Sequence, residues 1–237
     1  MAYHMQFGPV LAWTPELAQG ALSTLVLSAQ SIVAGVTIGM VVAVARVDGP
    51  RWLGRIGATY VEAFRNTPLL VQLFLIYFGL PYIGLKLSAD TAAVIAISLN
   101  LGAYSAEIIR AGLLAIPRTQ IEAGLALGMT RLEVVRYIVV VPALRIIYPA
   151  LTGQLTLTLL GTSMASAISA TELTAAGARI ESTSFRSLET FVVIAAIYIV
   201  MTFSFRLLYW IIGRRLFRRK VPRPSLLGDV SGTGAAA

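Results

Sequence analysis

Polar side chains recur at helical spacing within stretches of the chain that are otherwise apolar. Five of them, between residues 146 and 171, follow one another at intervals of four, four, four and three: Gln154, Thr158, Thr162, Ser166 and Ser169. This spacing places them on one slowly drifting face of a helix. Hydroxyl and amide groups replace water around a zwitterion without holding it tightly. We therefore predict that this face belongs to a pathway for a small polar solute.

Further polar residues extend this predicted pathway into two other apolar stretches and one adjacent position. They are Thr67, Gln72, Asn100, Tyr104 and Ser163. The alternative is that such residues only make hydrogen bonds between helices, each worth about 0.6 kcal/mol. That alternative accounts for any single residue, but it accounts less well for a continuous stripe.

Two pairs of opposite charges lie three residues apart, which is the spacing of neighbours on a helix surface. They are Glu62 with Arg65 and Glu107 with Arg110. Opposite charges side by side lower the cost of placing both in a poorly hydrated site, so we predict a structural role for each pair. Next to the first pair, Pro68 interrupts an apolar run and predicts a bend.

The elements that must position these residues are membrane helices. Of the 237 residues, 57% are hydrophobic and 13% are charged, and a helix needs about 20 mostly apolar residues to cross the hydrocarbon core. Apolar runs with few charges predict five spans, at residues 17–45, 66–85, 91–116, 146–171 and 190–213. The expected fold is an all-α membrane protein with five transmembrane helices.

Positive charge is unevenly distributed between the predicted loops, and cytoplasmic loops retain lysine and arginine. These residues concentrate in segments 46–55, 110–145 and 206–223. We expect those segments in the cytoplasm and residues 1–16 outside. The net charge of +8 includes the cluster RRLFRRK at 214–220, which we attribute to membrane anchoring rather than to nucleic acid binding. The tail beyond it, to residue 237, is expected to be disordered.

The connector between the third and fourth predicted spans carries its own start and stop signals. Thr119 with Glu122, and Thr130 with Glu133, have the spacing of a capping box. Gly128 stands between them, where a helix ends in a left-handed residue. Residues 117–142 are thus predicted to form a helix, a sharp turn and a second helix, with a proline limiting the second. This rigid shape suits docking by another surface.

The run EAGLALGMTRLEVVRYIVVVP, at residues 122–142, resembles the cytoplasmic signature of ABC importer permeases. Glu122, Ala123 and Gly128 match that signature, whereas Gly124 replaces an alanine and Pro142 comes one position late. The segments EAFRNTPLLVQLFLIYFGLP at 62–81, NLGAYSAEIIRAGLLAIPRTQIEA at 100–123 and SMASAISATELTAAGARIESTSFRSLE at 163–189 resemble the polar amino acid branch of these permeases.

This resemblance implies a type I ABC importer permease fold in the inner membrane of a bacterium or archaeon. The coupling helix would lie within residues 119–130 and sit in a groove of a separate ATPase subunit, which would bind ATP and Mg²⁺. The coupling residues carried over are Thr119, Glu122, Ala123, Gly124, Gly128 and Thr130. A second permease chain, identical or related, and an external binding protein would complete an amino acid importer.

Two observations on the residues bear on cargo and on chemistry. Relatives often carry a Lys-Asp pair where this chain has Leu160 and Gly161, which favours a neutral or acidic amino acid over a cationic one. The chain contains no Gly-Lys-Ser/Thr phosphate loop, so we expect it not to be an enzyme and to hold no cofactor or metal itself.

Two other classes of function compete with this interpretation. The first is a stand-alone channel or an ion-coupled carrier for small polar solutes, which would transport without ATP. The second is a membrane serine protease, suggested by GTSM at 161–164. A serine nucleophile needs a positioned base, and the only histidine, His4, lies far from it in the sequence.

Overall fold

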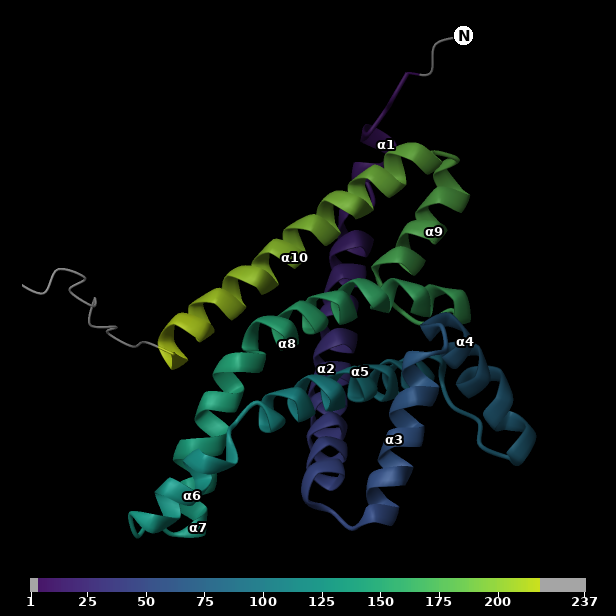
Figure 1. Ribbon diagram of the computed structural model, residues 1–237. Coiled ribbons are helices and arrows are strands. Elements are labelled where there is room, and N and C mark those ends of the chain that lie inside the picture. The colour runs from purple at the N-terminus through teal and green to yellow at the C-terminus, as the bar shows by residue number, and fades with distance from the viewer. Residues whose placement is uncertain (1–3, 218–237) are drawn as a thin grey trace, which may run out of the picture.

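The computed structural model describes residues 4–217, and within them the chain is helical without any strand (Figure 1). The elements are α1 (Gly8–Leu11), α2 (Thr14–Asp48), α3 (Arg51–Arg65), α4 (Leu69–Phe74), η1 (Leu75–Gly79), η2 (Leu80–Ile83), α5 (Ala89–Leu114), α6 (Arg118–Ala126), α7 (Arg131–Glu133), η3 (Val134–Val140), α8 (Val141–Gly161), η4 (Thr162–Ile168), α9 (Leu173–Ser184) and α10 (Ser187–Leu216). Elements η1 and η3 are π-helical, and η2 and η4 are 3₁₀-helical.

Helices α2 and α5 form the centre of the bundle and pack extensively against each other (Figure 1). Glycines of α2 make this crossing close: a Cβ atom on Gly35 would lie 2.9 Å from Leu101 Cβ, and one on Gly39 would lie 2.5 Å from Ser105 Cβ. Membrane helices associate through small residues because apolar side chains gain little by leaving lipid. The other elements pack around this pair.

Four helical stretches are long and apolar enough to cross a membrane, and they correspond to four of the five predicted spans. They are Thr14–Asp48, Ala89–Leu114, Arg131–Ile168 and Ser187–Leu216. The prediction of an all-α membrane protein is confirmed. The third of these stretches begins at Arg131 rather than at residue 146, because the connector continues directly into the membrane helix.

The remaining predicted span, residues 66–85, contains one helical stretch, Leu69–Ile83, which is too short to cross a membrane by itself. Helix α3 and the stretch Leu69–Ile83 meet at an angle of 107°, and only this bent pair taken together would provide a fifth span. The bend lies at the proline that predicts it: Pro68 precedes α4, and its ring cannot continue α3. Helix α3 is amphipathic and carries charges, so a search for uncharged runs misses it.

The second helix of the connector is not a separate element. Helix α7 passes through the π-helix η3 into α8, whose first turn contains Pro142. Pro142 is predicted to limit how this helix enters the membrane, and the helix instead continues through Pro142 without a break.

The two ends of the molecule are distinct in Figure 1. At one end the N-terminal segment meets the α9–α10 turn, where the Gln6 N–H donates to Glu189 Oε1 at 3.0 Å and Arg186 Nη2 donates to Gln6 Oε1 at 3.1 Å. At the other end lie α6, α7 and the α2–α3 turn (Figure 1). The tail predicted to be disordered, residues 221–237, lies outside the described residues.

Candidate functional site

The predicted turn of the connector closes α6 with a complete set of backbone hydrogen bonds. The Met129 N–H donates to Gly124 O at 3.1 Å, and the Gly128 N–H donates to Leu125 O at 3.0 Å. Gly128 has a φ of 81°, as the sequence predicts. This pattern is a Schellman motif, which glycine favours because it has no Cβ to clash in the left-handed region. The chain therefore reverses sharply after α6.

Only one of the two expected capping boxes is present. The Glu133 N–H donates to Thr130 Oγ1 at 3.3 Å, and the Thr130 N–H donates to Glu133 Oε2 at 2.8 Å. The box expected at Thr119 and Glu122 is absent because α6 begins two residues earlier than expected, with Pro117 rather than Thr119 as its N-cap. Thr119 consequently lies inside the first turn of α6, and both it and Glu122 are exposed.

The two small residues of α6 have different surroundings. Ala123 is exposed, whereas Gly124 is buried against its own chain, where an added Cβ would clash with Ile138 Cδ1 and lie 3.2 Å from Val134 Cγ2. Gly124 therefore closes α6 onto η3 and does not belong to a docking face. The outward surface of the turn is instead apolar: Leu125, Leu127 and Leu132 are 45%, 84% and 76% exposed.

The predicted polar stripe on the fourth span is divided into two parts. Thr158 and Thr162 are buried, and their hydroxyls donate to Gln154 O at 3.0 Å and Leu159 O at 2.7 Å within their own helix. At Thr162 the chain becomes a 3₁₀-helix with about three residues per turn, which rotates the later positions away from the earlier face. The expectation of one continuous polar face is therefore wrong.

Ser166 and Ser169, beyond this change of helix type, line an open cavity of about 500 Å³ between η4 and α9. Thr174 and Arg179 of α9 line the same cavity. Ser163 is partly exposed, and its hydroxyl donates to Leu160 O at 2.8 Å. Of the polar residues predicted on the fourth span, these serines are the ones that reach an open surface beyond the end of α8.

Three of the other predicted pathway residues form one hydrogen-bonded cluster at the bend between α3 and α4. Gln72 is 5% exposed, and its Nε2 donates to Thr67 Oγ1 at 2.8 Å and to Phe64 O at 2.8 Å. Asn100 Nδ2 of α5 donates to Gln72 Oε1 at 3.0 Å. These contacts hold the bend against α5, so this cluster fits the alternative of interhelical hydrogen bonding.

Of the two predicted charge pairs, Glu107 with Arg110 forms an ion pair and Glu62 with Arg65 does not. Arg110 Nη2 donates to Glu107 Oε2 at 2.9 Å, and Arg46 of α2 pairs with the other oxygen of the same carboxylate. Glu62 and Arg65 do not pair: Glu62 Oε2 accepts from Asn66 Nδ2 at 3.0 Å, and the Arg65 guanidinium lies 5.5 Å from the ring centre of Tyr104. Asn66 lies four residues after Glu62, one helical turn along α3, and takes the place expected for Arg65.

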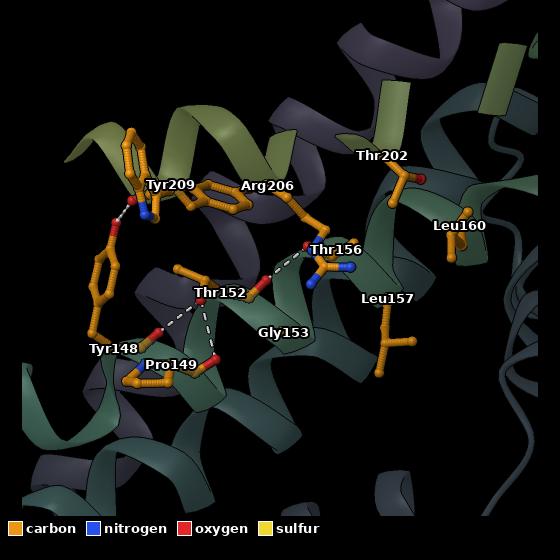
Figure 2. Close-up of a pocket in the computed structure, with 11 residues that line it drawn as sticks. Tyr148, Pro149, Thr152, Gly153, Thr156, Leu157, Leu160, Thr202, Arg206 and Tyr209 are labelled. Atoms are coloured by element: carbon orange, nitrogen blue, oxygen red, sulfur yellow. Dashed lines mark hydrogen bonds between the residues drawn. The ribbon is translucent and has the colours of Figure 1, made fainter. Parts of the chain in front are cut away.

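A larger cavity, of about 680 Å³, lies between α8 and α10 (Figure 2). Tyr148 closes one end of the cavity, and the Tyr148 hydroxyl donates to Tyr209 O at 2.6 Å. Arg206 is the charged residue that lines the cavity. Thr152 and Thr156 line it from α8, but their hydroxyls donate to carbonyls of their own helix (Figure 2). None of the predicted pathway residues lines this cavity.

Glu172 is a buried carboxyl that sequence analysis misses. It caps α9, accepting from the Thr174 N–H at 2.7 Å and the Ala175 N–H at 2.6 Å, and the Tyr198 hydroxyl of α10 donates to it at 2.9 Å. Burial raises the pKa of this carboxyl, against the lowering effect of its backbone donors. The sequence signal is an acidic residue directly before a run of good helix formers.

Comparison with known proteins shows which family the chain resembles. Residues 35–218 match the family described as "Binding-protein-dependent transport system inner membrane component". The chain is 38% identical to the octopine transport system permease protein OccM of Rhizobium meliloti, over 96% of this chain and 98% of that one. It is also 38% identical to the glutamine transport system permease protein GlnP of Escherichia coli K12, over 91% and 98% of the two chains.

Two solved structures show the same fold. A crystal structure of an amino acid ABC transporter with histidines superposes with a TM-score of 0.82, at 37% identity, over 90% of this chain and all of that chain. An inward-facing structure of the MetNI methionine ABC transporter gives a TM-score of 0.73 at 22% identity, over 87% and 99%. The type I ABC importer fold expected from the sequence is confirmed.

Proposed function

The chain belongs to the family of binding-protein-dependent transport system inner membrane components, and we propose that it is the permease subunit of an ATP-driven amino acid importer. Its relatives include permeases named for octopine and glutamine transport. In this proposal an external binding protein delivers the amino acid, and two permease chains, identical or related, form the path across the inner membrane. The proposal places the N-terminus outside and the C-terminus in the cytoplasm, in accord with the distribution of arginine.

The observation that carries the proposal is the exposed apolar turn between α6 and α7. Leu125, Leu127 and Leu132 project from an element held rigid by a Schellman motif and a capping box. An apolar patch on a rigid polar-rimmed turn is typical of a protein interface. We assign residues 119–130 as the docking element for a separate ATPase subunit, which supplies ATP and Mg²⁺ binding.

The continuity of the helix after this turn gives a mechanism for coupling. Movement of the docked turn is carried through α7 and η3 into α8, since no break separates them. The π-helix η3 and Pro149 inside α8 are the points where that helix can bend. ATP on the partner supplies the free energy for closing the ATPase pair. The chain's own part is to convert this displacement into a switch from inward to outward opening.

Co-purification of the ATPase tests this assignment. We would express the tagged full chain in its native host together with Leu127→Asp and Glu122→Arg, and identify by mass spectrometry a co-purifying subunit that carries a phosphate loop. Both substitutions are expected to reduce its yield at least tenfold. The matched control is Leu85→Asp, another exposed leucine, which should keep it. A chain that purifies alone in every case would support the carrier alternative.

The cargo is proposed to be a neutral or acidic amino acid. Leu160 and Gly161 stand at the end of α8, before the serines that line the η4–α9 cavity, and no carboxylate lies on this stretch. An added Cβ at Gly161 would meet only Leu69 Cδ2, at 3.5 Å, so an aspartate fits there. Gly161→Asp is expected to raise the uptake of arginine relative to glutamine, with Gly161→Asn as the uncharged control. Unchanged selectivity would remove the basis for this assignment.

A further inference from the structure

A strongly basic cavity lies at the α6 end of the molecule, apart from the coupling turn. It has a volume of about 520 Å³ and is formed where the α2–α3 turn meets α5. Four arginines line it: Arg46, Arg51, Arg55 and Arg110. None of the residues assigned to coupling or to solute passage contributes to it.

Among residues 4–217, the arginines of this cavity pair with one carboxylate. Glu107 accepts from Arg46 at one oxygen and from Arg110 at the other. Arg51 and Arg55 have no carboxylate within 4.0 Å among the described residues. In addition, Arg110 Nε is buried and has no hydrogen-bond partner in that part of the chain. An unpartnered buried guanidinium donor is costly, so the arginines of this cavity offer more donors than the described residues accept from.

Helix α3 presents its inner face to this cavity in a way that leaves room for a ligand. Arg51, Gly54, Arg55 and Ala58 lie at positions i, i+3, i+4 and i+7, so two arginines alternate with two small residues on one face. A Cβ on Gly54 would meet only Arg46 Cα, at 3.9 Å. No side chain caps the start of α3, so its first N–H groups add positive potential beside Arg51.

The outer face of α3 indicates the depth of the cavity relative to the membrane. Trp52 and Ile56 are 63% and 59% exposed and belong to an amphipathic helix. Tryptophan is enriched at the membrane interface, so we place α3 at that interface, with Arg51 and Arg55 lining the open cavity. A basic pocket between membrane helices at this depth has the charge that attracts an anionic phospholipid headgroup.

We propose that this cavity binds a phosphate-bearing anion through Arg51, Arg55 and the guanidinium of Arg110. Arginine suits this group because its planar guanidinium matches phosphate oxygens in a bidentate geometry. The phosphate can come from the headgroup of an anionic phospholipid or from free phosphate. Binding would neutralise the excess charge and hold the α2–α3 turn against α5.

A pair of substitutions at Gly54 tests the proposal without removing any arginine. Gly54→Glu places a carboxylate in the cavity, and Gly54→Gln places a neutral side chain of the same size there. Retention of phosphatidylglycerol by the purified full chain would be measured by native mass spectrometry, with phosphatidylcholine as the neutral lipid. We expect Gly54→Glu to weaken phosphatidylglycerol binding about thirtyfold and Gly54→Gln to change it by less than threefold.

Two further experiments complete the test. Arginine substitutions distinguish binding in the cavity from attraction by general surface charge, and competition with inorganic phosphate identifies the source of the phosphate. The double variant Arg51→Ala/Arg55→Ala should lose phosphatidylglycerol binding to the same extent as Gly54→Glu. The double variant Arg214→Ala/Arg215→Ala removes equal charge at the end of α10 and should keep that binding. Displacement of the lipid by millimolar inorganic phosphate would assign the site to free phosphate, and persistence of the lipid would assign it to the headgroup. The proposal is overturned if neither phosphatidylglycerol nor inorganic phosphate distinguishes Gly54→Glu from Gly54→Gln.

Discussion

At the scale of single residues, three glycines of this chain serve different purposes. Gly128 supplies a left-handed backbone conformation that ends α6. Gly124 instead supplies space, because Ile138 and Val134 occupy the volume that a side chain would need. Gly54 has open space around it and faces the basic cavity. Identical residues in one sequence therefore carry distinct constraints, and only the first is visible from sequence spacing.

Gly128→Ala is expected to destabilise the end of α6 by about 1–2 kcal/mol, since an alanine Cβ clashes in the left-handed region. Gly128→Asn should cost less, because asparagine adopts that region more readily. Hydrogen exchange at the Met129 amide, which is bonded to Gly124 O, measures the effect directly. Equal protection of this amide in the wild type and in Gly128→Ala would show that the turn tolerates another conformation.

At the scale of elements, α9 is tied to the bundle by a buried polar cluster rather than by apolar packing alone. Glu172 caps α9 and accepts from Tyr198 of α10, while the Leu173 N–H donates to Thr24 Oγ1 of α2 at 3.0 Å. Helix α2 thus meets the consecutive helices α9 and α10 beside one buried carboxyl. In a poorly hydrated site such a cluster is stable only when every member is satisfied.

The raised pKa of Glu172 predicts a pH dependence of this attachment. A carboxyl that binds its proton more tightly when folded stabilises fully below its unfolded pKa, which for glutamate is about 4.3. That contribution is lost as the pH rises through the folded pKa. The contribution of Glu172 to the thermal stability of the purified chain should therefore decrease as the pH rises above about 4.3. In Glu172→Gln this decrease of thermal stability with pH should be absent.

The control for this measurement lies on the same helix. Glu181 accepts a hydrogen bond from Ser187 Oγ at 2.6 Å and is only partly buried. Glu181→Gln should not remove the part of the pH dependence that Glu172→Gln removes. Parallel profiles for Glu172→Gln and the wild type would contradict the role given to Glu172.

At the scale of the whole molecule, the two ends differ in charge and in shape. The α6 end holds the exposed apolar turn and the basic cavity, and the opposite end joins the N-terminal segment to the α9–α10 turn (Figure 1). Each end offers one residue that is almost fully exposed: Leu127 at 84% and Phe185 at 87%. These two positions report which end faces which compartment.

Cysteine labelling tests the proposed orientation, and the chain suits it because it has no cysteine of its own. With the N-terminus outside, a membrane-impermeant maleimide should label Phe185→Cys in intact spheroplasts and should label Leu127→Cys only after the membrane is permeabilised. Both variants are expressed without the ATPase, so that Leu127 is not covered, and the thermal stability of each purified variant serves as the control for folding. The reverse labelling pattern would mean that the arginine distribution does not set the orientation of this chain.

The sequence by itself determined the class of fold and the nature of the connector. Apolar runs of sufficient length locate four membrane helices, since every backbone group in lipid must be satisfied within the helix. The turn at Gly128 and the box at Thr130 follow from local chemistry within a few residues. Pro68 likewise marks the bend of the remaining span, because proline acts on its own turn of helix.

Only the tertiary structure decided which polar residues meet one another and which reach an open surface. A change from α to 3₁₀ at Thr162 rotates Ser166 and Ser169 away from Thr158, and the bend at Pro68 brings Gln72 to Asn100. Arg46 reaches Glu107 across a close crossing of α2 and α5. Such contacts depend on helix type and on the angles between helices, which accumulate over many residues and are not set by the spacing within any one segment.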